Sequence, residues 1–264
     1  MTFKDEHPCV SVVTAAFNCE KTIRRCLESV QRQTFSNWEH IVVDDGSTDG
    51  TAALLADFAR SDSRIRVLRT ARNGGAAVAR NQALKEARGR FIAFIDADDE
   101  WLPEKLETQI RFMAENDVHF SYGAYFIVPP GQEGRRLVFT PPGSLTYRDL
   151  LKGCPVGCSS VVFDRGAIGI EYMPHLRRGQ DWALWLKLAR RTDRIAAYPG
   201  VHVIYHRSKG SLSSGKLKKI ADVWGVYKRC ENLGTLPSLK YFACHAYYRL
   251  VRKRERIAYV SNYE

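Results

Sequence analysis

The sequence lacks the long apolar runs and paired cysteines that are typical of membrane-spanning and disulfide-bonded proteins. No apolar segment approaches the roughly 18 residues that a membrane-spanning helix requires, and the opening residues, MTFKDEHP, do not show the charged-then-apolar pattern of an export signal. Seven cysteines are scattered along the chain, and no second pair or nearby histidine completes a zinc set with Cys154 and Cys158. We therefore expect a cytoplasmic protein with reduced thiols.

Glycine-rich phosphate-binding motifs are also missing from the start of the chain. No G-x-G-x-x-G follows the first strand-like segment, which excludes a dinucleotide-dependent oxidoreductase. A sugar nucleotidyltransferase would place a Gly-rich loop with Arg and Lys at the same point, where this chain has AAFNCEKT. A sugar nucleotidyltransferase remains an alternative function, although this chain lacks the loop that is usual in that class.

Basic residues are in excess, and most of the excess lies near the C-terminus. The formal net charge is +11, and residues 216–264 hold eleven Lys and Arg against four Asp and Glu. Such a balance predicts an anionic partner, which is a nucleic acid, an anionic membrane or a phosphorylated small molecule. A nucleic-acid-binding module would leave the acidic residues described below unexplained, because they repel phosphates, so we expect no nucleic acid partner.

The first 120 residues alternate strand-like and helix-like segments, which predicts an α/β fold with a parallel sheet flanked by helices. In such sheets ligands bind beyond the carboxyl ends of the strands. The expected strands are residues 10–16, 39–44, 65–68 and 91–95, and the expected helices are residues 21–33, 51–60, 75–87 and 104–116.

After residue 120 the pattern changes to short strands separated by Pro- and Gly-rich loops. We expect strands at 120–127, 137–139 and 159–163, and one strong helix at 181–191 whose Trp182, Trp185, Leu186 and Ala189 recur at the spacing of a core-facing stripe. The predicted domains are a catalytic unit, 1–215, with a nucleotide-binding half (8–120) and an acceptor half (121–215), followed by a basic amphipathic helical extension, 216–264.

Three carboxylates follow the apolar run 91–95 directly, at Asp96, Asp98 and Asp99. Crowded carboxylates repel one another, so they persist together only where a cation, a proton or open water offsets the repulsion. Three other polar motifs occur at the ends of the preceding strands: TAAFN at 14–18, VDDGSTDGT at 43–51 and RTARNGGAAVARN at 69–81.

These four motifs, in this order, resemble those of the inverting glycosyltransferases of family 2. The resemblance covers residues 8–214 and is greatest to small bacterial members that build the repeat units of O-antigen, capsule and teichuronic acid. It implies the GT-A fold, a Rossmann-like and mostly parallel sheet flanked by helices. It also implies a UDP-sugar donor and an acceptor that is a glycan or a sugar linked to polyprenyl diphosphate.

The expected donor site combines residue chemistry with this resemblance. Asp44 and Asp45 can accept hydrogen bonds from a uracil N–H or from ribose hydroxyls, and their alternative role is an Asx-turn and helix cap. The resemblance places Asp45 and Phe17 against the base. The predicted nucleotide-sugar-binding residues are Ala15, Phe17, Asp44, Asp45, Arg72, Asn73, Arg80, Asp96, Ala97, His206, Arg207 and Ser211.

The resemblance also identifies Asp96-Ala97-Asp98 as a DxD motif, which implies a divalent cation that bridges carboxylates and the donor diphosphate. Mn²⁺ and Mg²⁺ prefer oxygen ligands and stabilise a departing UDP as its charge builds. The predicted metal ligands are Asp96, Asp98, Asp99 and His206. Solvated aspartates that cap the next helix are the alternative, and for His206 a loop-packing role is equally compatible.

A fifth motif, RRGQDWALWL, implies a catalytic base at Asp181. Relatives usually carry Glu-Asp at this helix start, and here Gln180 replaces the glutamate. A plain helix cap is the alternative role for Asp181, and Glu171 is the next candidate for the base. The resemblance implies an in-line displacement that turns an α-linked donor into a β-linked product. One sugar per encounter is expected, because the Gln-x-x-Arg-Trp motif of processive synthases is absent.

The C-terminal extension has apolar residues at helical spacing together with a basic cluster. Because relatives use acceptors carried on polyprenyl diphosphate, we expect peripheral binding to an anionic membrane at its cytoplasmic face. The alternative is that the apolar stripe packs on the catalytic unit. The apolar residues are Leu239, Phe242, Ala243, Ala246, Tyr247 and Leu250, and the basic ones are Lys240, Arg249, Arg252, Lys253, Arg254 and Arg256.

Overall fold

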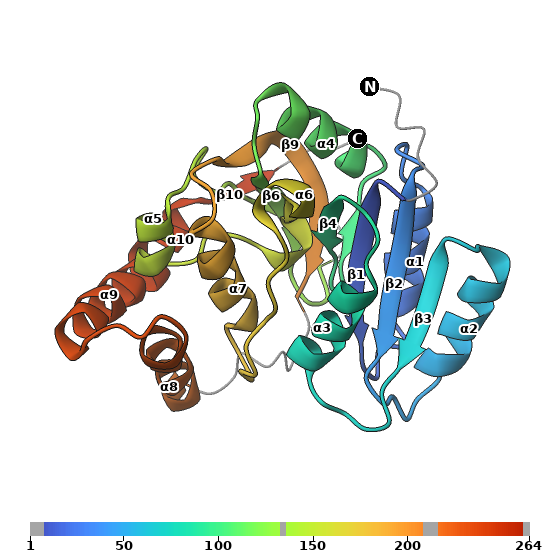
Figure 1. The fold of residues 1–264 in the computed structure, drawn as a ribbon, viewed down its shortest axis with the longest axis horizontal. Coiled ribbons are helices and arrows are strands. Elements are labelled where there is room, and N and C mark those ends of the chain that lie inside the picture. Colours follow the sequence, from blue (N-terminus) through green and yellow to red (C-terminus); the bar gives the residue numbers. More distant parts are fainter. Residues whose placement is uncertain (1–7, 133–135, 208–215, 261–264) are drawn as a thin grey trace.

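The computed structural model describes residues 8–132, 136–207 and 216–260, which form an α/β unit around one large sheet (Figure 1). Within these residues no helix combines the length and the apolar character needed to cross a bilayer. The strand order is β10-β7-β6-β8-β4-β1-β2-β3, and β9 pairs with β6 and β5 off this path.

The N-terminal half of the sheet confirms the predicted alternation of strands and helices. The strands β3, β2, β1 and β4 are neighbours in that order and all pair in parallel. The carboxyl ends of these strands therefore meet at one edge. The elements are β1 (Val10–Ala16), α1 (Ile23–Gln31), β2 (Trp38–Asp44), α2 (Thr51–Ser61), β3 (Ile65–Arg69), α3 (Ala76–Glu86) and β4 (Phe91–Phe94).

The second half makes the sheet mixed, so the expectation of mostly parallel strands describes only the first half. The strand β8 pairs antiparallel with both β4 and β6, and β7 pairs antiparallel with β6. The elements are β5 (Glu100–Trp101), α4 (Lys105–Glu115), β6 (Phe120–Val128), β7 (Arg136–Phe139), α5 (Tyr147–Lys152), a 3-10 turn (Cys158–Ser160), β8 (Val162–Asp164), α6 (Arg165–Ile168), α7 (Gln180–Ala189) and β9 (Ile195–His206).

The long strand β9 was not predicted from the sequence. It pairs in parallel with β6, with two irregularities in register, and it contains Pro199 and Gly200. These two residues read as a turn, because proline cannot donate to a ladder and glycine weakens a strand. The strand delivers His206 to the edge of the sheet, where the polar motifs lie.

The core occupies both faces of the sheet, because alternate strand residues point to opposite sides. Val13 and Val43 belong to the cluster that includes α3, α5 and α7, and the intervening Val12 and Val42 belong to the cluster that includes α1, α2 and α4. The predicted core positions on α7 are confirmed, since all four are buried: Trp182, Trp185, Leu186 and Ala189.

The extension lies beside α5 and α7 at one end of the molecule (Figure 1). It ends in a strand that was not predicted, β10, which pairs antiparallel with β7 and so joins the sheet. Its elements are α8 (Lys216–Gly225), a π-helical turn (Val226–Cys230), α9 (Thr235–Tyr247), a second π-helical turn (Tyr248–Arg252), α10 (Lys253–Glu255) and β10 (Ile257–Val260).

One side of the extension packs on α7. The ring of Trp182 lies 5.4 Å from that of Tyr227 and 4.8 Å from that of His245, and the Tyr227 hydroxyl donates to the carbonyl of Leu151 at 2.7 Å. Buried Glu231 pairs with Arg190 at 2.6 Å, near the end of α7. The extension therefore forms part of the support of this helix.

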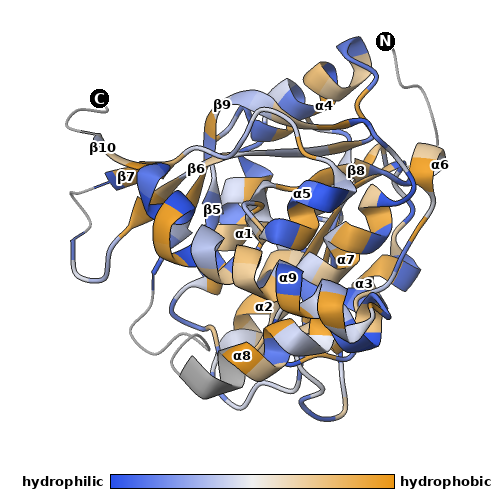
Figure 2. Cartoon of the chain, turned by 90° about the vertical axis from the view of Figure 1, so that its left-hand side faces the viewer, coloured by the Kyte–Doolittle hydropathy of each residue, from blue (hydrophilic) through white to orange (hydrophobic). Residues whose placement is uncertain are grey.

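The apolar stripe predicted on α9 divides between two environments. Phe242 is half-buried, packs against the core and lies 6.2 Å from the ring of Trp224. Leu239 and Leu250 of the same stripe are instead 52% and 65% exposed, and Leu236, which was not part of the predicted stripe, is 80% exposed. Figure 2 shows apolar and polar residues together on this surface of α9.

Candidate active site

A cavity of about 1080 Å³ opens where β1, β2 and β4 end and where α1, α3 and α7 begin. Eight of the predicted site residues line it: Ala15, Phe17, Asp45, Asn73, Arg80, Asp96, Ala97 and Asp98. Residues not predicted from the sequence complete the lining, among them Asn18, Glu20, Lys21, His175, Arg177 and Gln180.

Asp45 ties the end of β2 to the glycine-rich loop before α3. Its carboxylate accepts hydrogen bonds from the backbone N–H groups of Gly74 at 2.9 Å and Gly75 at 2.7 Å, and from the Thr70 hydroxyl at 3.0 Å. The loop approaches so closely that a Cβ on Gly46, which has a φ of +74°, would lie 3.1 Å from the backbone nitrogen of Asn73. Asp45 therefore shapes this wall of the cavity.

Asp44 and Arg72 do not line the cavity. The carboxylate of Asp44 is buried, accepts from the backbone N–H of Ser47 at 3.0 Å and lies 3.3 Å from the guanidinium of Arg69. These contacts match the alternative role predicted for Asp44, which is to form an Asx-turn, and not the binding of a nucleotide. Arg72 is exposed. Phe17, by contrast, lines the cavity with its ring 46% exposed, so an aromatic surface is available to a ligand.

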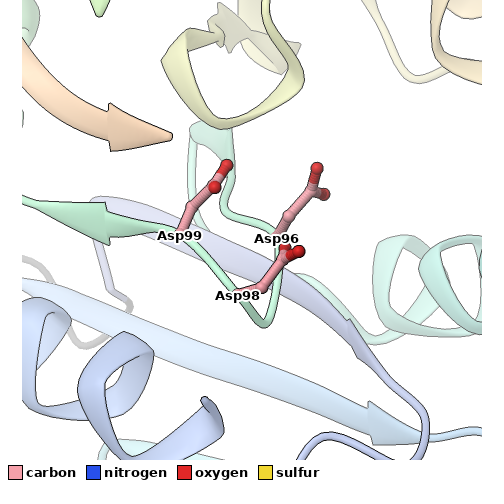
Figure 3. Close-up of side chains that lie close together, drawn as sticks. All are labelled: Asp96, Asp98 and Asp99. Atoms are coloured by element: carbon pink, nitrogen blue, oxygen red, sulfur yellow. The ribbon is translucent and has the colours of Figure 1, made fainter. Parts of the chain in front are cut away.

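The three aspartates after β4 form a tight cluster (Figure 3). One carboxylate oxygen from each of Asp96, Asp98 and Asp99 lies within 4.8 Å of the others. Ser159 holds the cluster together, because its hydroxyl donates to Asp99 at 2.5 Å and accepts from the backbone N–H of Asp96 at 3.0 Å. The backbone N–H of His206 also donates to Asp99, at 3.3 Å, which joins the end of β9 to the cluster.

The electrostatics of the cluster favour binding of a cation. Burial and the charge of Asp96 raise the pKa of Asp98, and burial with the charges of Asp96 and Asp98 raises the pKa of Asp99 well above its usual value. Arg80 offsets part of the charge, since its guanidinium lies 2.5 Å from Asp96. Three crowded carboxylate oxygens are the donor set that Mg²⁺ and Mn²⁺ prefer, so these residues fit such an ion.

Asp181 stands at the start of α7, next to the cavity-lining Gln180. Gly179 lies immediately before the first residue of α7 and has a φ of +72°, a left-handed conformation that glycine adopts without strain. Burial raises the pKa of the Asp181 carboxyl, while the positive charge of Arg80 lowers it. Arg80 thus acts electrostatically on both Asp181 and Asp96. Glu171, the second candidate base, is engaged by Arg191 in an ion pair at the other end of α7.

The C-terminal candidates are only partly brought to the site. The imidazole Nε2 of His206 lies 3.7 Å from the carboxylate of Glu100, and its charge lowers the pKa of Asp98. Arg207 is exposed, and its backbone N–H donates to the carbonyl of Val128 at 3.0 Å. Ser211 lies outside the described residues.

Two residues that support the cluster carried no signal in the sequence. Ser159 lies 60 positions from Asp99, inside a segment that reads as a plain strand start. Arg25 on α1 donates to the backbone carbonyl of Asp98 at 2.8 Å and lies 3.5 Å from Glu100. Only the folded chain brings these residues to the acidic loop.

Comparisons with known sequences agree with the geometry. The family model "Glycosyl transferase family 2" matches residues 11–163. TuaG of Bacillus subtilis, a glycosyltransferase named for teichuronic acid biosynthesis, is 40% identical over 228 residues, which is 86% of this chain and 90% of TuaG. UDP-Glc:alpha-D-GlcNAc-diphosphoundecaprenol beta-1,3-glucosyltransferase WfgD of Escherichia coli is 40% identical over 218 residues, which is 82% of this chain and 84% of WfgD.

Solved structures share the fold at lower identity. TarS 1–349 of S. aureus in complex with UDP-GlcNAc is 22% identical, with a TM-score of 0.71 over 92% of this chain and 73% of TarS 1–349. The mannosyltransferase PcManGT of Pyrobaculum calidifontis, in complex with GDP-Man and Mn²⁺, is 19% identical, with a TM-score of 0.66 over 93% of this chain and 71% of PcManGT. These comparisons confirm the resemblance predicted from the sequence, in preference to a sugar nucleotidyltransferase or a nucleic-acid-binding module. The chain belongs to glycosyltransferase family 2 and has the GT-A fold.

Proposed function

We propose that this glycosyltransferase moves a sugar from a UDP-sugar to a hydroxyl of a lipid-linked glycan precursor of a cell-surface polysaccharide. The main support is that one cavity is lined by the loop shaped by Asp45, by the acidic residues after β4 and by Gln180 at the start of α7, and that Asp181, the next residue, stands directly behind this lining. These are the three parts that such a transfer requires: a nucleotide site, a site that offsets phosphate charge and a base.

Several features support a UDP-sugar as the donor. The cavity of about 1080 Å³ is slightly larger than the range of about 300–1000 Å³ that is usual for ligand sites, so it has room for a nucleotide-sugar. The exposed ring of Phe17 offers a stacking surface for the base, and Asp45 and Asn73 lie on the same wall. WfgD uses UDP-Glc by its name, and TarS was solved with UDP-GlcNAc.

A divalent cation, Mn²⁺ or Mg²⁺, is the proposed cofactor. Asp96, Asp98 and Asp99 would hold it, with His206 beside them, because their oxygens are already gathered, and burial together with the neighbouring carboxylate charges raises the pKa values of Asp98 and Asp99. When bound, the ion neutralises charge on the diphosphate leaving group. The Mn²⁺ bound to PcManGT supports this assignment.

Asp181 is the proposed catalytic base. It removes the proton from the acceptor hydroxyl as that oxygen attacks the anomeric carbon, and the β-linkage of the product follows from inversion at an α-linked donor. The raised pKa of Asp181 brings its carboxyl closer to the operating pH, which improves proton transfer. The positive charge of Arg80 opposes this rise of the pKa and so favours the charged form that accepts the proton.

The acceptor is proposed to be presented at the cytoplasmic face of a membrane. WfgD acts on a diphosphoundecaprenol-linked sugar by its name. The extension of this chain offers a matching surface, which joins the exposed Leu236, Leu239 and Leu250 to exposed Lys240, Arg249 and Arg252. Basic residues near an anionic bilayer contribute about 1 kcal/mol each, so peripheral and reversible attachment is expected.

Binding of Mn²⁺ in the presence of UDP should strengthen as pH rises from mildly acidic to neutral. The pKa values of Asp98 and Asp99 are raised, so protons compete with the ion until the pH exceeds those values.

Asp98→Ala should abolish the binding of Mn²⁺ in the presence of UDP and leave the fold intact. Isothermal titration calorimetry measures both effects, with Asp57→Ala, an exposed aspartate on α2, as the matched control. Unchanged affinity in Asp98→Ala would remove the metal assignment.

Asp181→Asn should separate donor binding from chemistry. The amide cannot accept the hydroxyl proton, so turnover should fall by about a hundredfold to ten-thousandfold, while the dissociation constant for UDP with Mn²⁺ stays within about twofold. Steady-state kinetics and calorimetry measure the two quantities. Asp193→Asn, an exposed position beyond the end of α7, is the control. Normal turnover in Asp181→Asn would show that the base lies elsewhere.

If the extension attaches the protein to a membrane, binding of the protein to vesicles should depend on lipid charge and on the exposed leucines of the extension. The full chain should sediment with phosphatidylglycerol vesicles at low salt, less at high salt and poorly with phosphatidylcholine vesicles. Leu239→Glu combined with Leu250→Glu should weaken sedimentation at least about tenfold, and Tyr172→Glu, an exposed aromatic outside the extension, should not. Equal sedimentation of all three proteins would contradict membrane attachment through α9.

A further inference from the structure

Three cations gather where the extension meets the acceptor half of the catalytic unit. Lys253 comes from α10, Arg249 from the π-helical turn before it, and Arg207 from the residue that follows β9. In the part of the chain that the structure describes, no carboxylate lies within ion-pair distance of any of the three. Neighbouring Arg252 differs, because Glu255 is its partner at 3.6 Å.

Lys253 is the most enclosed member of this cation cluster. Its side chain is half-buried, and its ammonium nitrogen lies 5.7 Å from the centre of the Phe139 ring on β7. Burial lowers the pKa of Lys253, and the positive charges of Arg249 and Arg207 lower it further. A half-buried ammonium group that faces two other cations is unfavourable unless an anion offsets the repulsion.

The cation cluster is connected to Asp181 through the helical extension. The ring of His245 packs 4.8 Å from that of Trp182, the residue after Asp181, and Arg249 and Lys253 follow His245 along the same helical run. The negative charge of Asp181 acts on Lys253, and both groups act on the thiol of Cys154 in the loop after α5. Arg80, which pairs with Asp96, acts on the same carboxyl from the donor cavity. The proposed base thus interacts electrostatically both with Arg80 of the donor cavity and with Lys253 of the cation cluster.

We propose that Arg207, Arg249 and Lys253 bind the diphosphate of a lipid-linked sugar acceptor. This inference rests on the proposed function and adds the acceptor subsite to it. Asp181 and Lys253 interact electrostatically, so a sugar whose hydroxyl is at Asp181 can place its anomeric diphosphate at this unpartnered cluster of cations. Arg and Lys supply the charge-assisted hydrogen bonds that a diphosphate accepts.

The surroundings of the cluster favour this ligand over a plain solvated patch. Leu250 and Val251, which lie between Arg249 and Lys253 in sequence, are exposed, so an apolar chain leaving the diphosphate has apolar surface to follow. The donor diphosphate is accounted for by the acidic cluster at Asp96, Asp98 and Asp99. We assign Arg207 to a second phosphate-bearing substrate, together with Arg249 and Lys253, rather than to the donor as predicted from the sequence, because Arg207 does not line the donor cavity.

The test compares two soluble acceptors with UDP-glucose as donor. One is an N-acetylglucosamine α-diphosphate ester with a short alkyl chain, and the other is the alkyl α-glycoside of the same sugar without the diphosphate. Lys253→Gln should raise KM for the diphosphate acceptor about tenfold or more, and leave KM for the glycoside and the affinity for UDP with Mn²⁺ unchanged. Arg249→Gln, an exposed position that does not endanger folding, should act in the same direction.

Lys85→Gln, which removes an exposed lysine near the end of α3, is the matched control and should change neither KM. Equal KM values for the diphosphate acceptor in wild type, Lys253→Gln and Arg249→Gln would overturn the inference while transfer itself upholds the proposed function. If wild type transfers to neither acceptor, calorimetry with the diphosphate ester in the presence of UDP decides: binding that Lys253→Gln weakens supports the subsite, and binding that it leaves unchanged, or no binding, overturns it.

Discussion

Repulsion among the carboxylates of Asp96, Asp98 and Asp99 is the constraint around which the site is organised. The core strand β4 delivers them to one edge, and Ser159 and the end of β9 fix their positions, so they cannot separate to relieve the repulsion. The protein offsets part of the charge with Arg80, while burial and the remaining carboxylate charges raise the pKa values of Asp98 and Asp99. In the proposed function, a divalent ion bound together with the donor diphosphate would complete the balance of charge.

The basic extension belongs to the same design, although it follows the catalytic motifs in sequence. Tyr227 and His245 pack on Trp182, one residue after the proposed base, and Glu231 is paired to Arg190 near the far end of the same helix. This side of the extension therefore supports the base, while its other side exposes leucines and basic residues. This division suits the proposed function, in which the donor binds in the cavity next to α7 and a lipid-linked acceptor approaches from the extension.

Sequence reasoning predicted the part of the fold that local patterns encode. Buried parallel strands such as β2 and β4 are continuous apolar runs, and their ends carry the motifs, so the parallel half and most of the cavity followed directly. The strand β9 was missed because Pro199 and Gly200 interrupt its pattern, and β10 because it is short and follows a charged helix. The contacts of Asp45 with Gly75, 30 residues away, could not be read from the sequence, since they depend on how β2 and α3 meet.

The central claim is that this chain transfers a sugar with inversion and with the help of a divalent ion. The direct measurement is proton NMR of the product formed from an α-linked UDP-sugar and a sugar diphosphate ester, with and without a chelator of divalent cations. The account predicts a β-anomeric coupling in the new linkage, and loss of product when the chelator is present and recovery when Mn²⁺ is restored. An α-linked product, or full turnover in the presence of the chelator, would contradict it.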